Sequence, residues 1–207
     1  MEKLYKGLHH FRQGFFRNEE EFFQRISEGQ SPEVLFITCS DSRVDPNLVT
    51  QSRPGELFIV RNVGNIIPPY DAIRDKNSVA AALEYAVLVL HVKDIVVCGH
   101  SNCGALQAMF SPSSQAERCT HLRNWLSLAQ PLQDIMHKYY HTTSSEIFSR
   151  IAEEENVLLQ LENLETYPFI SDALQAGTLR LHGWYYDIGG GQVCSYNPET
   201  ESFDRIH

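Results

Sequence analysis

The chain has 207 residues, of which 43% are hydrophobic and 21% are charged, as in ordinary single globular domains. Its formal net charge of −9 disfavours nucleic acid and anionic membranes as partners, because both attract basic patches. No apolar run is long enough for a membrane span, and the first residues form no secretory signal. The five cysteines are an odd number and are spread through the chain, which indicates a reduced, cytoplasmic protein without a disulfide framework.

The N-terminal segment has apolar side chains at helical spacing, which predicts two helices over residues 3–29. Asn18 is the expected N-cap of the second helix, and Gly29 is its expected end. The first helix is rich in aromatic residues, so we expect residues 1–29 to form an arm that packs on a partner subunit. Packing on its own domain is the alternative. Residues 30–207 are expected to complete the same single domain, 1–207.

Three apolar runs after the arm have the length and β-branched content of buried strands, at 34–38, 57–61 and 94–98. Residues 78–92, before the third run, predict an alanine-rich helix that is too apolar on all sides to lie on the surface. Strands and helices of these lengths imply right-handed crossovers and a parallel sheet.

The rest of the chain is expected to be helical from residue 103 to about residue 177. Residues 178–186 and 192–196 then predict two more strands, joined by a run of glycines into an antiparallel hairpin at the sheet edge. The fold class is therefore α/β. We expect a mainly parallel central sheet of four parallel strands plus one antiparallel edge strand, flanked by helices.

Side chains that carry chemistry follow two of the predicted strands. Cys39, Asp41 and Arg43 alternate after the first strand, and an extended backbone would direct all three to the same side. His100 and Cys103 follow the third strand, where turns at neighbouring glycines, 99 and 104, would let them converge. Because the carboxyl ends of parallel strands meet at one edge of a sheet, we expect these side chains to gather there.

Two thiolates and one imidazole favour Zn²⁺, and three protein ligands leave a fourth tetrahedral position open, which is typical of a catalytic site. Each feature alone is unspecific. Cys98 is an alternative ligand, although its place in an apolar run favours core packing. An alternative interpretation of Asp41 and Arg43 is a salt bridge that only stabilises the end of the strand. The remaining histidines are expected at the surface.

The motifs CSDSRVDP at 39–46 and GHSNCG at 99–104 together resemble those of the β-class carbonic anhydrases. The resemblance covers nearly the whole chain. It implies one Zn²⁺ per subunit, bound by Cys39, His100 and Cys103. It also implies a homodimer, or a larger oligomer of dimers, in which N-terminal helices cross to the partner.

The resemblance extends to the plant-type branch of that family through the residues of the substrate pocket. The implied substrate-binding residues are Gln30, Phe58, Val63, Tyr85 and Gly104. Ala105 departs from the pattern, because plant-type members usually have a second glycine there. The pattern GLxxFRxG at 7–14 is similar to that of cyanobacterial members associated with carboxysomes, although the chain is short for such a member.

The resemblance implies reversible hydration of CO₂ to bicarbonate and a proton, by attack of zinc-bound hydroxide on CO₂. Asp41 and Arg43 are the implied catalytic pair: Asp41 orients the hydroxide, and Arg43 keeps Asp41 ionised and away from the metal. Two other hypotheses are a hydrolase of COS or CS₂ with the same ligands, and an interaction protein that uses zinc as a structural staple. The expected location is the cytoplasm, with carboxysomes and their components as a further possibility.

Overall fold

The computed structural model describes residues 1–73, 76–110 and 116–206, which form two compact units, Met1–Ser31 and Pro32–His207. The first unit contains α1 (Glu2–His10), a π-helical segment (Phe11–Phe16) and α2 (Glu20–Ser27). The N-cap prediction at Asn18 is wrong, because Asn18 still belongs to the preceding helix and lacks the extended backbone of a cap residue. Helix α2 also ends earlier than expected, at Ser27, with Glu28 rather than Gly29 at the C-cap.

Aromatic rings hold the first unit together. The ring of Phe23 lies 5.1–5.9 Å, between centroids, from the rings of Phe11, Phe15 and Phe16. The ring of Phe11 also lies 6.1 Å from those of Phe15 and Phe16. Within this unit the apolar residues on α1 have no such cover, since Leu4 and Leu8 are both exposed. Packing of this arm on a partner subunit stays a prediction.

The second unit is built on six strands and seven α-helices within the described residues. The strands are β1 (Val34–Cys39), β2 (Leu57–Asn62), β3 (Asp94–His100), β4 (Arg180–Asp187), β5 (Gln192–Asn197) and β6 (Ser202–Arg205). The helices are α3 (Pro46–Thr50), α4 (Ser78–Glu84), α5 (Gly104–Phe110), α6 (Thr120–Leu126), α7 (Gln130–Tyr139), α8 (Ser145–Glu165) and α9 (Pro168–Gln175). A π-helical segment, Tyr85–Val89, continues α4.

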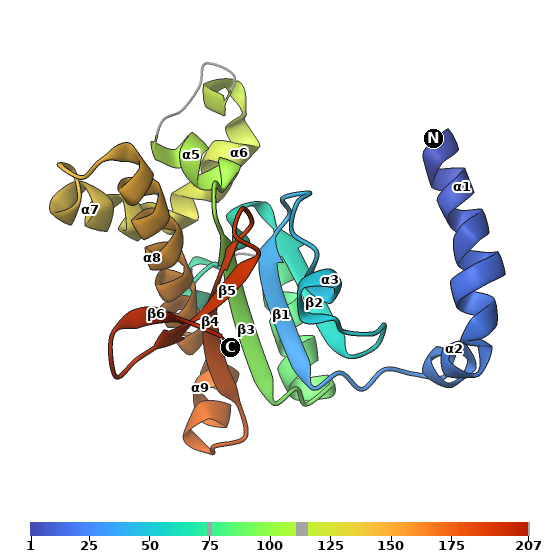
Figure 1. Ribbon diagram of the computed structural model, residues 1–207. Helices are drawn as coiled ribbons and strands as arrows, with labels where there is room; N and C mark the ends of the chain where they lie inside the picture. The colour runs from blue at the N-terminus through green and yellow to red at the C-terminus, as the bar shows by residue number, and fades with distance from the viewer. Residues whose placement is uncertain (74–75, 111–115, 207) are drawn as a thin grey trace. The chain divides into compact units, whose positions relative to one another are not determined.

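The sheet has the order β2-β1-β3-β4-β5-β6 (Figure 1). Strands β2, β1, β3 and β4 are parallel, and β5 and β6 are antiparallel to their neighbours. The predicted α/β class and the four parallel strands are confirmed. The sequence reading missed β6, which is the true edge strand, because four residues of mixed polarity are too few for a strand pattern.

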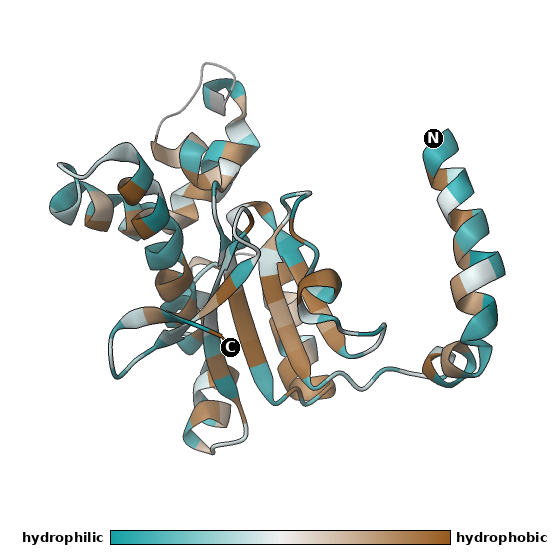
Figure 2. Cartoon of the chain, in the orientation of Figure 1, coloured by the Kyte–Doolittle hydropathy of each residue, from teal (hydrophilic) through white to brown (hydrophobic). Residues whose placement is uncertain are grey.

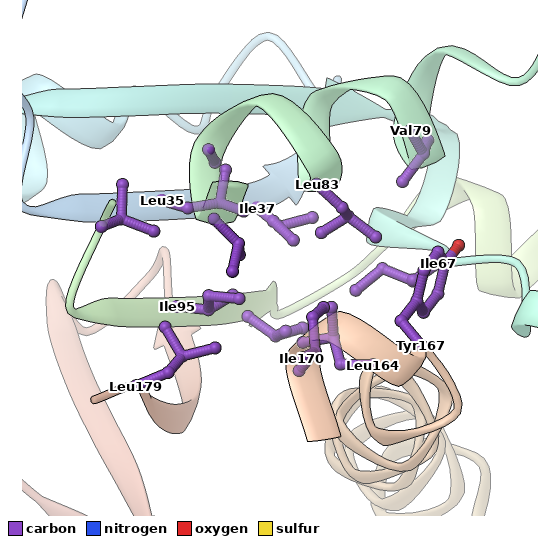
Figure 3. Close-up of a cluster of buried hydrophobic side chains, with 14 of the residues drawn as sticks. Leu35, Ile37, Ile67, Val79, Leu83, Ile95, Leu164, Tyr167, Ile170 and Leu179 are labelled. Carbon is purple, nitrogen blue, oxygen red and sulfur yellow. The ribbon is translucent and has the colours of Figure 1, made fainter. Parts of the chain in front are cut away.

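One face of the sheet carries the largest buried cluster. Leu35 and Ile37 of β1 and Ile95 of β3 point toward α4, α8 and α9, where they meet Leu83 and Leu164 (Figure 3). The central strands β1 and β3 are accordingly the most continuously apolar elements of the second unit (Figure 2). A second buried cluster, around α5 to α8, includes Cys39 and Cys103 and so lies directly beside the metal-ligand candidates.

The apolar helix expected over residues 78–92 forms, but it is not buried on all sides. Val79 and Leu83 are in the core, whereas Leu88 and Val89 of the π-helical continuation are exposed in this chain. Within the described ranges, none of the helices has both the length and the apolar character needed to cross a lipid bilayer.

Candidate metal centre

The structure brings Cys39, His100 and Cys103 together at the carboxyl edge of the sheet. Cys39 is the last residue of β1, His100 is the last residue of β3, and Cys103 lies between β3 and α5. Their ligand atoms all lie within 4.8 Å of one another. The three side chains are no more than 5% exposed, so the site is enclosed by protein on most sides.

The turn that lets His100 and Cys103 converge is made by a residue that was not predicted to form it. Asn102 has a φ of 56°, in the left-handed region, whereas Gly99 lies inside β3 and Gly104 begins α5. The turn expected at these two glycines is therefore wrong. Gly99 serves a different purpose, because a Cβ there would lie 2.7 Å from Val157 Cγ2 on α8. A side chain at this position would push the helix away from the sheet.

The imidazole of His100 is oriented as a metal ligand requires. Its Nδ1–H donates a hydrogen bond of 3.0 Å to the carbonyl oxygen of Ser101, which leaves a lone pair on Nε2. Nε2 is buried and has no hydrogen-bond partner among the described residues. A buried polar atom without a partner is costly, and a cation at this position would provide one.

The two sulfur atoms also fit a divalent cation. A hydrogen bond from the Cys103 thiol lowers the pKa of Cys39 to about 4, against the effect of burial. The same contact, together with burial, raises the pKa of Cys103, because two close thiolates repel each other. A cation between them removes this conflict and lets both sulfurs bind as thiolates. Two sulfurs and one imidazole nitrogen suit Zn²⁺.

Cys98 takes no part in this group. Its thiol donates a hydrogen bond to the carbonyl oxygen of Gly99, and burial raises its pKa to about 12. The metal-ligand cluster found among the described residues comprises Cys39, His100 and Cys103 only. The structure thus places Cys98 in the core.

Asp41 and Arg43 form a bidentate ion pair beside the candidate ligands. The Nε of Arg43 donates to Oδ1 of Asp41 at 2.9 Å, and Nη2 donates to Oδ2 at 2.7 Å. These hydrogen bonds hold the pKa of Asp41 well below its ordinary value, so the carboxylate stays ionised. Oδ2 of Asp41 lies 4.0 Å from Nε2 of His100, which places the ionised carboxylate at the rim of the metal-ligand group.

Comparison with known proteins places this geometry in a family. The family model described as carbonic anhydrase matches residues 34–193. A carbonic anhydrase of Synechocystis sp. is 43% identical over 98% of this chain and 73% of its own length. One of Synechococcus elongatus is 42% identical over 99% of this chain and 74% of its own length.

Solved structures agree with the sequence relatives. The structure of the β-carbonic anhydrase CcaA has a TM-score of 0.96 and 43% identity, covering 100% of this chain and 99% of its own. The chain belongs to the β-carbonic anhydrase family. A structure of the tetrameric β-carbonic anhydrases from Sordaria macrospora has a TM-score of 0.81 and 29% identity, covering 94% of this chain and 95% of its own. The predicted family is therefore confirmed, and the protein is a carbonic anhydrase, an enzyme that hydrates CO₂.

The expected pocket residues of this β-carbonic anhydrase lie on several elements. Phe58 of β2 and Tyr85 after α4 have ring centroids 5.8 Å apart. Val63 is exposed and directly precedes Gly64, whose N–H donates to the sulfur of Cys39 at 3.4 Å. Gly104 directly follows the candidate ligand Cys103 and begins α5. Gln30 belongs to the first compact unit, and its part in the pocket stays a prediction.

Two further residues support the backbone around the candidate site. Arg61 of β2 donates to the carbonyl oxygens of Cys39 at 3.1 Å and Asp41 at 2.6 Å, which fixes the backbone between them. Trp125 of α6 donates from Nε1 to the carbonyl oxygen of Val63 at 2.7 Å. Arg61 lies in a stretch to which the family resemblance extends, but no sequence spacing predicts either contact, because the partners are 20 to 62 positions away.

Proposed function

We propose that the protein converts CO₂ and water to bicarbonate and a proton, reversibly, with one Zn²⁺ per subunit held by Cys39, His100 and Cys103. The observation that carries the proposal is the convergence of these three ligand atoms within 4.8 Å. Three protein ligands leave a fourth position for the reaction, as in catalytic zinc sites. When bound, zinc supplies a nucleophile for CO₂ by lowering the pKa of a coordinated water to about 7.

In this proposal Asp41 orients the nucleophile. An ionised carboxylate can only accept hydrogen bonds. Asp41 would therefore accept a hydrogen bond from the nucleophile, and this would direct the nucleophile's lone pair toward CO₂. Arg43 keeps Asp41 ionised and holds both of its oxygens in place. The pair therefore acts as a fixed acceptor rather than as a free base.

The pocket residues suit a small apolar substrate. Phe58, Val63 and Tyr85 offer apolar surface, and CO₂ has little need of hydrogen bonds from its site. We propose that Gly104 leaves room beside the ligand Cys103, since a glycine adds no side chain there. The amide of Gln30 is proposed to donate to an oxygen of bicarbonate.

We further propose that the protein acts as a homodimer or a larger oligomer in the cytoplasm, within carboxysomes where these exist. The exposed apolar residues of α1 support the oligomer, and the relatives from Sordaria macrospora are tetrameric. The sequence pattern at 7–14 supports association with carboxysome components. Native mass, with and without residues 1–29, tests the oligomer, and cosedimentation with carboxysome shells tests the location.

The deciding experiment measures zinc content and stopped-flow CO₂ hydration in the same preparations. Cys39→Ser and His100→Ala should lose both zinc and hydration, while Asp41→Ala should keep zinc and lose rate. Cys98→Ser is the matched control, because Cys98 is an equally buried thiol outside the ligand group and should keep both. Full hydration by Cys39→Ser protein would contradict the proposal. Faster turnover of COS or CS₂ than of CO₂ would favour the hydrolase hypothesis.

A further inference from the structure

Helix α8 carries buried polar side chains for which the proposed reaction has no use. Glu153, Asn156, Gln160 and Asn163 follow each other at intervals of three, four and three residues, which places them on one face of the helix. They are 3%, 0%, 0% and 8% exposed. Buried polar groups are costly unless they are hydrogen-bonded, so their partners indicate what this face does.

Asn156 is connected to Cys39 through a single residue. Its Nδ2 donates to the carbonyl oxygen of Gly64 at 3.0 Å, and the N–H of Gly64 donates to Sγ of Cys39 at 3.4 Å. The amide of Asn156 is itself held, because Nε2 of Gln160 donates to its Oδ1 at 3.0 Å. Helix α8 therefore fixes the residue that contacts the first sulfur ligand.

Glu153 is connected to the second sulfur ligand. Its Oε1 accepts the backbone N–H of Cys103 at 2.9 Å. Its Oε2 accepts the hydroxyl of Tyr185, from β4, at 3.0 Å. Both oxygens of the carboxylate are thus engaged, and the backbone of Cys103 is tied to α8 one helical turn before Asn156.

We propose that Asn156 and Glu153 are positioning residues that set the separation of the two sulfur ligands through the rigid helix α8. Asn156 acts on Cys39 through Gly64, and Glu153 acts on the backbone of Cys103. The inference rests on the proposed zinc site. It adds that the geometry of the site depends on a helix that contributes no ligand.

The chain offers a matched control on the same helix. Asn163 donates from Nδ2 to the carbonyl oxygen of Ile67 at 2.8 Å and to Oε1 of Gln160 at 3.2 Å. It is the same residue type, on the same face of α8, bonded to the same loop. Ile67, however, makes no hydrogen bond to a ligand sulfur among the described residues, and its own N–H donates to Gln160.

The test compares zinc affinity, by competition with a chelator, in the full-length protein and its variants. Asn156→Ala should weaken zinc binding by about 10- to 100-fold, as loss of groups that orient ligands usually does, and Asn163→Ala should change it by no more than about twofold. In the cobalt-substituted protein, the sulfur-to-metal absorption should shift in Asn156→Ala and not in Asn163→Ala. Both variants lose two buried amide hydrogen bonds, so their thermal unfolding without metal should fall comparably.

Glu153 is tested by a conservative rescue. Glu153→Ala should weaken zinc binding, and Glu153→Gln, which keeps one oxygen for the N–H of Cys103, should recover most of it. If Asn156→Ala does not fold, Asn156→Ser provides the same comparison, because the serine side chain is shorter than that of asparagine and leaves room for water.

Three outcomes separate this inference from the proposed function. Equal zinc affinities and equal cobalt spectra for Asn156→Ala and Asn163→Ala would overturn the inference and leave the zinc site intact. Equal zinc affinities for Glu153→Ala and the unchanged protein would overturn the part that concerns Cys103. Absence of stoichiometric zinc from the unchanged protein would overturn the proposed function, and the inference with it.

Discussion

Arg43 connects Asp41 to the other half of the site. The Nη2 that donates to Oδ2 of Asp41 also donates to the carbonyl oxygen of Asn102 at 2.9 Å. Asn102 is the left-handed turn residue that directly precedes Cys103. The segment after β1 and the segment after β3 are therefore linked by one guanidinium. Its removal should reduce the rate of the reaction more than it reduces zinc binding.

Arg43→Ala is expected to keep zinc and to lower kcat by about 10- to 100-fold, because Asp41 loses the group that fixes it. The pKa of Asp41 should rise toward its ordinary value. A lowered carboxyl pKa stabilises the folded state above the unfolded pKa of about 3.9, and this stabilisation is lost as the pH falls through the folded value. The difference in thermal unfolding between the two proteins should thus be present at neutral pH and shrink in acid.

Arg180 is the control for this variant. It makes the same bidentate contact, with Nε and Nη2 each 2.8 Å from an oxygen of Asp94, where β3 and β4 begin. This end of the strands is opposite to the proposed site. Arg180→Ala should leave kcat unchanged. An equal loss of kcat in both variants would show that the effect of Arg43 is one of general stability.

The zinc-free protein is expected to hold a thiolate at Cys39 in mildly acidic solution. Cys103 holds the pKa of Cys39 well below the ordinary thiol value of about 8.5, whereas the pKa values of Cys98 and Cys103 are raised. Ultraviolet absorbance at about pH 6 should therefore report a thiolate that Cys39→Ser removes. The same absorbance in both proteins would refute this.

The two thiols also predict how the stability of the zinc-free protein depends on pH. The lowered pKa of Cys39 stabilises the fold fully above about pH 8.5, and this contribution is lost as the pH falls toward the folded value. The raised pKa of Cys103 stabilises the fold below about pH 8.5 and is lost as the pH rises. Their combined contribution should peak near that pH, which denaturant unfolding of the protein and of a Cys39→Ser, Cys103→Ser variant would measure.

Zinc removal should destabilise the folded protein through binding linkage. Zinc at 100 times its Kd should raise the free energy of unfolding by about 2.7 kcal/mol relative to the zinc-free protein. Cys98→Ser should respond to zinc in the same way, and Cys39→Ser should not respond. Thermal unfolding before and after dialysis against a chelator measures the difference. A response in Cys39→Ser protein would place the metal elsewhere.

The sequence predicts the candidate ligand group because its members lie at the ends of strongly apolar strands. Cys39 and His100 end β1 and β3, which are neighbours in a parallel sheet, so their meeting follows from topology. The bond between Glu153 and Cys103 joins residues 50 positions apart and depends on how α8 lies on the sheet. No periodic pattern in the sequence predicts that contact. All four residues at 153–156 are polar or charged, yet α8 buries Glu153 and Asn156.

The error at Gly99 shows a second limit, because a glycine in a sequence has several physical meanings. A turn, a bulge and a close approach of two elements all favour the absence of a side chain. Only the structure distinguishes them here, through Val157 of α8. The actual turn residue, Asn102, is one of the few types other than glycine that tolerate the left-handed region.

Gly99→Ala tests the close approach of β3 and α8. The new Cβ would lie 2.7 Å from Val157 Cγ2 and 3.3 Å from the carbonyl oxygen of Glu153, so one element must move. We expect the free energy of unfolding to fall by about 1–3 kcal/mol, as for other overpacked sites. Zinc affinity should fall as well, because Glu153 holds the backbone of Cys103.

Gly104→Ala is the stability control, since a Cβ there would meet nothing within 4 Å, and its unfolding free energy should change by less than about 0.5 kcal/mol. A second comparison identifies the clashing group. Adding Val157→Ala to Gly99→Ala removes the methyl group in the way, so the double variant should lose less stability than the sum of the two single changes. Strict additivity would mean that Val157 is not what keeps position 99 a glycine.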